Sequence, residues 1–430
     1  MNKDAVAEMS QQYQVETAEK LVPEGYKLTE VGVIPEDWEA IKMGGLAQIQ
    51  RGASPRPIDS PVWFDRNSSV GWLRISDASK AKKYLIKTVQ ALSEKGIAHS
   101  RFVPKNNLVM SICATVGKPV ITKKDLCIHD GFVVFNNLNA HQEYMYYVLE
   151  ELEDEWGKQG QTGSQMNLNT DLINSTYIAL PKKPEEQAAI ANALSDTDAL
   201  LSELEKLIAK KQAIKTATMQ QLLTGRTRLP QFAHHPDGSK KGYKQSELGE
   251  IPEDWEVTSI GETLSIRHGK NQKEVENSSG RYPIYGTGGQ MGWAMNYLYD
   301  KPSVLIGRKG TINKPRYIDK PFWTVDTLFY SEINKGFCAK FVFYKFCQID
   351  WEQYNEASGV PSLNAKTIEK VCVSFPEIKE QITIATILSD IDKEIQALEH
   401  RLNKTRQIKQ GMMQELLTGK TRLLTAELST

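Results

Sequence analysis

The sequence predicts an α+β fold in which two pseudo-twofold-related globular domains are joined by two long antiparallel coiled-coil helices. Three observations predict it: end motifs that occur twice, short apolar runs between turn residues, and a long helical pattern that closes each half. At 430 residues the chain is long enough for two or three domains with cores of their own, since a domain has roughly 100–200 residues.

An internal repeat sets the organisation of the chain. Ile34-Pro-Glu-Asp-Trp-Glu39 recurs unchanged 217 residues later as Ile251-Pro-Glu-Asp-Trp-Glu256. Leu222-Leu-Thr-Gly-Arg-Thr-Arg-Leu229 recurs 194 residues later as Leu416-Leu-Thr-Gly-Lys-Thr-Arg-Leu423. Because the shift falls along the chain, the first half carries extra residues in its middle. The two halves therefore share their ends and differ in between.

Each half divides into a globular part and a helix. Glycine, proline, aromatic residues and short apolar runs such as Leu108–Ile112 predict strands mixed with brief helices. The predicted parts are an N-terminal extension (1–25), a first globular domain (26–181), a first long helix (182–228), a linker (229–242), a second globular domain (243–376), a second long helix (377–423) and a C-terminal tail (424–430).

Both long helices carry an apolar stripe with alternating steps of four and three residues. This spacing is typical of a coiled-coil seam, and the equivalence of the halves favours an antiparallel pair. Two independent amphipathic helices are the alternative. Where the stripe turns polar, at Lys211, Lys215, Thr405 and Lys409, we expect a looser pair or contact with a partner. The predicted seam residues are Ile190, Leu194, Leu201, Leu204, Ile208, Ile384, Leu388, Ile391, Ile395, Leu398 and Leu402.

Charge is balanced over the whole chain but not along it. The sequence has 53 basic and 53 acidic residues. Residues 42–124 nevertheless hold 15 Lys/Arg against four Asp/Glu, and residues 257–320 hold ten against five. Two separate basic stretches favour two polyanion-binding surfaces, with an ordinary solvated surface as the alternative for each.

Several other classes of protein are disfavoured. The five cysteines are scattered, which argues against a structural zinc site and suits a reducing compartment. The first residues lack the apolar run of a signal peptide, and no segment approaches the ~18 apolar residues of a membrane span. These features predict a soluble cytoplasmic protein without a membrane partner.

The sequence offers no catalytic or metal-binding constellation. Gly419-Lys-Thr resembles the end of a phosphate-binding loop, but Gln414 stands where that motif needs glycine, so a helix-ending glycine is the better interpretation. Asp196 and Asp198, like their counterparts in the second helix, are two residues apart and would point to different helix faces. We interpret them as surface charge and predict no catalytic residue and no metal ligand.

Together these features resemble the specificity subunits of type I restriction–modification systems. The resemblance covers nearly the whole chain after about residue 20. It rests on the doubled Ile-Pro-Glu-Asp-Trp-Glu motif, the long helices headed by Glu-Gln and closed by Leu-Leu-Thr-Gly, and the segments Gly71-Trp-Leu-Arg-Ile-Ser-Asp77, Tyr282-Pro-Ile-Tyr-Gly286, Gly289-Gln-Met-Gly292 and Ile306-Gly-Arg-Lys-Gly-Thr-Ile312.

The resemblance implies a non-catalytic subunit with two target-recognition domains, each reading one half of a bipartite double-stranded DNA site. It implies that the helices act as a spacer and as the docking surface for two methyltransferase subunits, which restriction/translocase subunits join. S-adenosylmethionine, ATP and Mg²⁺ are then expected on those partners and not on this chain. The extension before residue 26 departs from the repeat, so its role stays open.

DNA reading needs Lys and Arg for phosphates, and Arg, Asn, Gln or Ser for base edges. The candidate DNA-binding residues are Arg51, Arg56, Arg74, Lys80, Lys82, Lys83, Gln165 and Asn167 in the first domain, and Arg267, Lys270, Lys273, Arg281, Arg308, Lys309 and Ser362 in the second.

A helix of about 40 residues is roughly 60 Å long, enough to hold two readers on successive major-groove turns about 34–36 Å apart. Because the middles of the two halves differ, we expect an asymmetric target with a non-specific gap. A coiled-coil scaffold that does not contact DNA and a stand-alone DNA-modifying enzyme are the alternatives.

Overall fold

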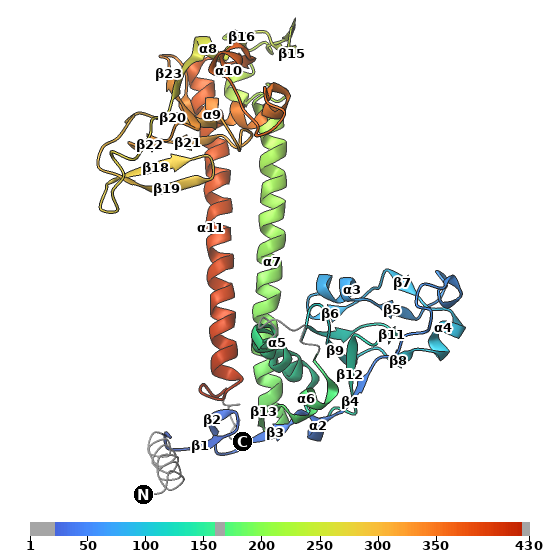
Figure 1. Cartoon of the computed structure of the whole chain (residues 1–430). Helices are drawn as coiled ribbons and strands as arrows, with labels where there is room; N and C mark the ends of the chain where they lie inside the picture. The colour runs from blue at the N-terminus through green and yellow to red at the C-terminus, as the bar shows by residue number, and fades with distance from the viewer. Residues whose placement is uncertain (1–21, 160–167, 424–430) are drawn as a thin grey trace, which may run out of the picture. The chain divides into compact units, whose positions relative to one another are not determined.

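The computed structural model describes residues 22–159 and 168–423. The chain forms two compact units: unit 1 is Met1–Glu203 with Leu402–Thr430, and unit 2 is Leu204–Arg401. Each unit takes part of both long helices, α7 (Pro184–Leu222) and α11 (Ile378–Leu416), drawn in green and red in Figure 1.

Unit 1 contains a five-stranded sheet in the order β4-β12-β9-β10-β6, a four-stranded sheet in the order β7-β5-β11-β8, and the pairs β1-β2 and β13-β3. Its elements are β1 (Tyr26–Thr29), β2 (Gly32–Pro35), β3 (Trp38–Lys42), α2 (Met43–Leu46), β4 (Gln48–Arg51), η1 (Pro61–Trp63), β5 (Gly71–Leu73), α3 (Ile75–Lys80), β6 (Tyr84–Leu85), β7 (Gln90–Ala91), α4 (Glu94–Ala98), β8 (Arg101–Val103), β9 (Leu108–Ser111), β10 (Pro119–Thr122), β11 (Leu126–Ile128), β12 (Phe132–Asn136), α5 (Gln142–Gln159), α6 (Thr170–Ser175) and β13 (Tyr177–Pro181).

The five-stranded sheet is buried on both faces, and strand alternation explains how. In β12, Phe132 and Val134 belong to a core shared with the four-stranded sheet. Val133 and Phe135 point to the opposite face and join the core that includes α5 and α7. This double burial explains why β12 is a continuous apolar run and not an alternating one.

Unit 2 contains a four-stranded sheet in the order β17-β23-β20-β21, a three-stranded sheet in the order β19-β18-β22, and the pairs β14-β15 and β16-β24. Its elements besides the long helices are η2 (Pro230–Phe232), β14 (Tyr243–Ser246), β15 (Gly249–Pro252), β16 (Glu256–Ser259), α8 (Ile260–Thr263), β17 (Leu264–His268), β18 (Tyr282–Gly286), β19 (Gly289–Ala294), β20 (Ser303–Gly307), β21 (Arg316–Ile318), β22 (Trp323–Thr324), β23 (Leu328–Ile333), α9 (Ala339–Gln348), η3 (Trp351–Tyr354), α10 (Ala365–Lys370) and β24 (Cys372–Phe375).

The sequence repeat is also a structural repeat. In the first hairpin Tyr26 pairs with Pro35, and 217 residues later Tyr243 pairs with Pro252 in the same register. The strand that follows each hairpin pairs antiparallel with the strand that precedes a long helix, β3 with β13 and β16 with β24. The shared ends of the two halves therefore build the same frame in both units.

Within unit 1 the two long helices pack antiparallel. Thr197 Oγ1 donates to Met412 Sδ at 3.5 Å, and Lys409 Nζ lies 2.7 Å from Asp198 Oδ1. As residue numbers rise on α7, those of the partners on α11 fall. Lys409 also lies 2.8 Å from Glu150 Oε2 of α5.

Unit 2 shows the same antiparallel arrangement with different residues. Lys211 Nζ lies 2.5 Å from Glu394 Oε2, and Lys215 Nζ lies 2.5 Å from Asp392 Oδ1. The three lysines that interrupt the seam, Lys211, Lys215 and Lys409, thus each pair with a carboxylate of the facing helix. The predicted α+β domains with antiparallel long helices are confirmed, while the pseudo-twofold relation between the domains stays a prediction.

Most predicted seam residues are buried. The buried seam residues are Ile190, Leu194, Leu204, Ile208, Ile384, Leu388, Ile395 and Leu402, and the half-buried ones are Leu201, Ile391 and Leu398.

Each long helix ends on a glycine that packs against the hairpin motif of the other half. Gly225, with φ +72°, follows α7, and a Cβ there would lie 2.4 Å from Pro252 Cγ. Gly419, with φ +71°, follows α11, and a Cβ would lie 2.6 Å from Pro35 Cδ. The left-handed backbone and the close approach both require glycine, so Gly419 ends a helix and does not form a phosphate-binding loop.

In unit 2 an arginine closes the junction between the end of α7 and the start of α11. Arg228 Nε and Nη2 each donate to Glu380 at 2.8 Å, and Nη1 donates to Asp254 Oδ1 at 2.7 Å. Trp255 Nε1 donates to Glu380 Oε2 at 3.3 Å. Burial raises the pKa of the Glu380 carboxyl, and the Arg228 hydrogen bonds oppose that shift.

Unit 1 contains the same arginine junction, built from the repeat counterparts. Arg422 Nε donates to Glu186 Oε1 at 2.6 Å and Nη1 donates to Asp37 Oδ1 at 2.9 Å. Trp38 Nε1 donates to Glu186 Oε2 at 3.2 Å. The Arg422 side chain is 28% exposed and that of Arg228 only 7%, so the unit 2 junction is more shielded from water.

We predict that Arg228→Ala destabilises unit 2 by about 3–5 kcal/mol, because it leaves the Glu380 carboxyl buried without its cation. Hydrogen-exchange mass spectrometry of the full chain measures this as faster exchange in residues 243–256. The matched variant Arg422→Ala should accelerate exchange in residues 26–39, by a smaller factor because its junction is more exposed. Unchanged exchange around both tryptophans would contradict the prediction.

Unit 2 also buries a lysine without a carboxylate partner among the hydrogen bonds and ion pairs of the described residues. Lys345 in α9 is 6% exposed, and Nζ donates to the Leu223 carbonyl at 2.6 Å and to Ser374 Oγ at 3.3 Å. Burial lowers the pKa of Lys345 to about 7. Tyr344 and Tyr147 donate hydrogen bonds to the equivalent aspartates Asp392 and Asp198, so the two tyrosines correspond to each other. The residue after Tyr147, Val148, is therefore the counterpart of Lys345 in unit 1.

The lowered pKa of Lys345 gives a signed prediction. An unfolded lysine has a pKa near ~10.4, so between about pH 7 and 10 the unfolded state binds a proton that the folded state does not. The free energy of unfolding of the wild type should therefore rise with pH in this window relative to Lys345→Met. Urea denaturation of both proteins at pH 6.5 and 9.5 measures the difference, and a difference independent of pH would contradict the prediction.

Candidate nucleic-acid interface

Two equivalent turns, one in each unit, position exposed cations. After β4, Gly52 N–H donates to Phe132 O at 2.8 Å; after β17, Gly269 N–H donates to Leu328 O at 3.0 Å. A Cβ on Gly52 would lie 2.0 Å from His129 O, and a Cβ on Gly269 would lie 2.0 Å from Val325 O. The backbones cross too closely for any side chain, so the residues beside each glycine are held firmly against the opposite turn.

At the first turn two predicted residues converge on Asp130. Arg51 Nε donates to the Asp130 carbonyl at 2.6 Å, and Arg56 Nη2 lies 3.4 Å from Asp130 Oδ2. Ser54 Oγ donates to the same carboxylate at 2.6 Å, and this hydrogen bond is the main reason that the pKa of Asp130 is lowered. The Arg56 side chain is 72% exposed, so its guanidinium can still reach a ligand.

The counterpart of Asp130 in unit 2 is Asp326, and it too receives an arginine. Arg308 Nη1 donates to the Asp326 carbonyl at 3.3 Å. Lys309 forms an isolated β-bridge with Ser362, and Leu363 N–H donates to Arg308 O at 2.9 Å. The structure therefore places the adjacent Arg308 and Lys309 beside Ser362, a predicted residue more than 50 positions further along the sequence.

The remaining predicted cations of unit 2 are exposed. Arg267 on β17 is 53% exposed and lies 2.9 Å from Glu332. The other three follow in the segment between β17 and β18: Lys270, Lys273 and Arg281.

Two predicted cations of unit 1 lie on or just after α3. Lys80 is exposed at the end of the helix, and Lys82 is exposed with Nζ 3.5 Å from Ser202 Oγ of α7. Arg74 is also exposed and is the residue just before α3.

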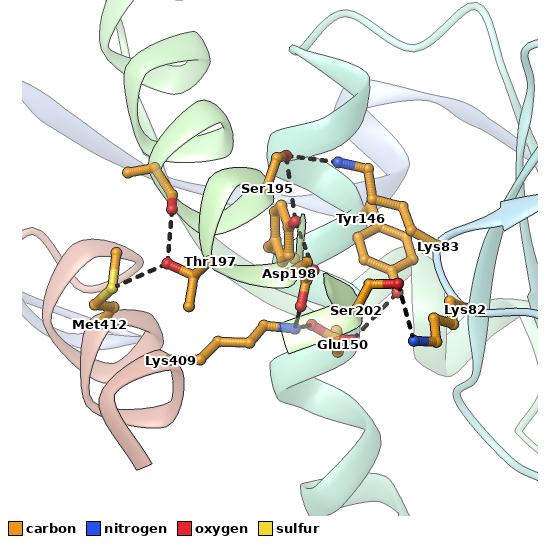
Figure 2. Close-up of polar contacts among 12 residues, drawn as sticks. Lys82, Lys83, Tyr146, Glu150, Ser195, Thr197, Asp198, Ser202, Lys409 and Met412 are labelled. Atoms are coloured by element: carbon orange, nitrogen blue, oxygen red, sulfur yellow. Dashed lines mark hydrogen bonds and ion pairs between the residues drawn. The ribbon is translucent and has the colours of Figure 1, made fainter. Parts of the chain in front are cut away.

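Lys83 lies elsewhere, and we leave it out of the DNA-binding surface. Its side chain is buried, and Nζ donates to Glu143 Oε2 and Ser195 Oγ, both at 2.6 Å. Figure 2 shows Lys83 reaching Ser195 of α7 while its neighbour Lys82 extends towards Ser202. The two side chains leave the bend between α3 and β6 in different directions, which a count of charges along the sequence does not register.

Asp198 is not simple surface charge, as the sequence had suggested. It accepts from Tyr147 Oη at 2.8 Å and pairs with Lys409, joining α5, α7 and α11 within unit 1 (Figure 2). Asp392 has the same role in unit 2, with Tyr344 Oη at 2.7 Å and Lys215. The sequence did contain a signal for this role: Asp198 recurs as Asp392, and Lys215 recurs as Lys409, each after 194 residues.

Sequence reasoning missed several residues beside the first turn. A hollow of about 970 Å³ in unit 1 is lined by Arg74 together with residues that were not predicted: Arg66, Gln90, Lys124 and His129. Two predicted residues, Gln165 and Asn167, lie outside the described residues. In residues 22–159 and 168–423, no group of three or more His, Cys, Asp or Glu side chains is placed to hold a metal ion, and no helix there could cross a membrane.

The two halves of the chain match one protein family. The match covers residues 35–216 and 252–409 and describes a type I restriction modification DNA specificity domain. The chain belongs to this family. The resemblance inferred from the sequence is thereby confirmed, and this protein is the non-catalytic DNA specificity subunit of a type I restriction–modification system.

Individual relatives match this specificity subunit over most of their length. The putative type I restriction enzyme MjaX specificity subunit of Methanocaldococcus jannaschii is 26% identical, with 94% of this chain and 98% of the relative covered. The type I restriction enzyme EcoprrI specificity subunit of Escherichia coli is 21% identical, with 82% and 87% covered. The S subunit structure from M. genitalium shares the fold with a TM-score of 0.60 at 17% identity, covering 92% and 99% of the two chains.

Proposed function

We propose that this specificity subunit reads a bipartite, asymmetric double-stranded DNA target, with one half-site for each recognition domain, 26–181 and 243–376. The observation that carries the proposal is the pair of glycine turns, at Gly52 and Gly269. Each turn holds a different set of exposed cations in an equivalent frame. Equivalent frames favour two similar docking modes on DNA, and different side chains favour two different sequences.

Phosphate contacts would fix the position of each domain, and base-edge contacts would specify the sequence. Lysines such as Lys80 and Lys270 supply point charges suited to phosphates. Arginines that are oriented by a neighbouring carbonyl, such as Arg51 and Arg308, are suited to base edges because the planar guanidinium can donate two parallel hydrogen bonds.

The chemistry would come from partner subunits. We propose that two methyltransferase subunits dock on the long helices, that restriction/translocase subunits join them, and that S-adenosylmethionine, ATP and Mg²⁺ bind to those partners. In unit 2 the outer surface of α7 exposes Leu207 and Ile214, which are seven residues apart and 40% and 41% exposed. Exposed leucine and isoleucine at heptad spacing suit a helix-packing partner better than water.

DNA contact by these cations should be visible as salt dependence. For the wild-type complex with its methyltransferase subunits, the logarithm of DNA affinity should fall linearly with the logarithm of salt concentration, by about 0.9 per phosphate contact. The double variant Arg56→Gln with Lys80→Gln should make this slope less steep, by the amount that corresponds to the loss of one to two phosphate contacts. Lys240→Gln, which removes an exposed charge from the linker, is the matched control. A salt-independent affinity would favour the scaffold function instead.

The helices should also set the gap between the half-sites. Each long helix has 39 residues, hence about 58 Å of length. Inserting four residues in both helices adds about 6 Å and should lengthen the gap by one to two base pairs. Methylation mapping in cells that express the complex reads the gap directly. A four-residue insertion in the linker 229–242 is the control that should leave the gap unchanged, and an unchanged gap in the helix variant would refute the spacer role.

A further inference from the structure

The hollow in unit 1 is a groove with a positive, partly aromatic wall. Its lining includes the cations Arg66, Arg74 and Lys124 and the single acid Asp59. Trp72 supplies part of the apolar wall, and its ring lies 5.9 Å from that of His129. We call this site the Arg74 groove, after one of its lining arginines.

A buried carboxylate ties together the backbones of two segments that line the groove, one at Arg74 and one at Val89. Asp77 is only 7% exposed. Its Oδ2 accepts from Arg74 N–H at 3.2 Å, and its Oδ1 accepts from Val89 N–H at 3.3 Å. One side chain therefore ties the start of α3 to the strand that carries Gln90, so the two walls of the groove keep a constant separation.

The guanidinium of Arg74 is also oriented. Nη1 donates to Gln90 Oε1 at 3.1 Å across the groove. An arginine has five N–H donors, so the contact with Gln90 orients the plane and leaves other donors for a ligand. A residue that only neutralised phosphate would gain little from such control, whereas reading a base edge depends on it.

The remaining lining residues fit the same use. A Cβ on Gly71 would lie 2.5 Å from Thr88 Oγ1 and 3.3 Å from Lys124 Cε, so glycine is needed to keep both at the groove. His129 Nδ1 accepts from Gly131 N–H at 2.8 Å, which places the ring proton on Nε2. Burial lowers the pKa of His129; the charge of Asp130 opposes this shift and the charge of Arg74 adds to it.

We propose that the Arg74 groove is a base-reading site of the first recognition domain, in which Arg74 recognises a guanine of the half-site through its O6 and N7 atoms. Gln90 and Asp77 are positioning residues for Arg74, and Arg66 and Lys124 hold the flanking phosphates. This inference rests on the proposed function, because it assumes that the first domain reads DNA. Bidentate donation to O6 and N7 is the geometry that an oriented guanidinium satisfies best.

The test uses the full chain assembled with its methyltransferase subunits, with methylation mapping of genomic DNA as the readout. Arg74→Lys keeps the charge but removes the planar guanidinium and its two parallel N–H donors. The preference for guanine at one position of the first half-site should therefore fall by roughly tenfold or more. The second half-site should be unchanged, which also shows that the variant folds and assembles. Lys124→Gln should instead weaken binding equally for all sequences and flatten its salt dependence.

The outcomes separate the two levels of the proposal. If the wild-type complex shows no bipartite target, the proposed function itself fails. If the target is bipartite but Arg74→Lys leaves every base preference of the first half-site intact, only the groove assignment fails. If Arg74→Lys abolishes methylation, affinities of the purified complex for DNA duplexes substituted at single guanines of the first half-site decide, and a uniform loss across these duplexes overturns the inference.

Discussion

The structure depends on the burial of one glutamate at the start of each long helix. Glu186 and Glu380 are 6% and 1% exposed, and a carboxylate in such a place needs a cation and hydrogen-bond donors. The arginine comes from beyond the end of the opposite long helix, and the tryptophan comes from the hairpin motif. Each unit therefore joins one half's helix start to the other half's helix end, which fixes the antiparallel pairing.

Within this chain the repeated ends build the same frame in both units, whereas the middles of the two halves differ. The repeated ends supply the hairpin, the arginine junction and the aspartate–lysine–tyrosine contacts. The middles are free to differ, and they do: Asp130 receives Arg51 and Arg56, whereas Asp326 receives Arg308. Because the glycine crossing is common to both units, the side chains at the two turns can differ without disturbing the core.

Charge in this protein has two structural uses that composition does not distinguish. Lys82 is exposed, whereas Lys83 beside it is buried against Glu143 and Ser195. Lys215 and Lys409 interrupt the apolar seam, yet each is neutralised by an aspartate of the facing helix. The number of Lys and Arg residues in a basic stretch is therefore the largest number that can lie on a basic surface. Burial and ion pairing reduce the number that remain accessible to DNA.

The sequence by itself determined the duplication, the α+β class, the long helices and the family, because these depend on local periodicity and on motifs repeated at readable distances. It also marked residues 42–124 and 257–320, the stretches that contain Gly52 and Gly269, as basic. Only the tertiary structure decided which cations stay exposed, that the doubled motif takes part in an arginine junction, and that Gln90, Asp77 and His129 surround Arg74. Those facts depend on side-chain direction and on contacts between distant segments, which a one-dimensional pattern does not encode.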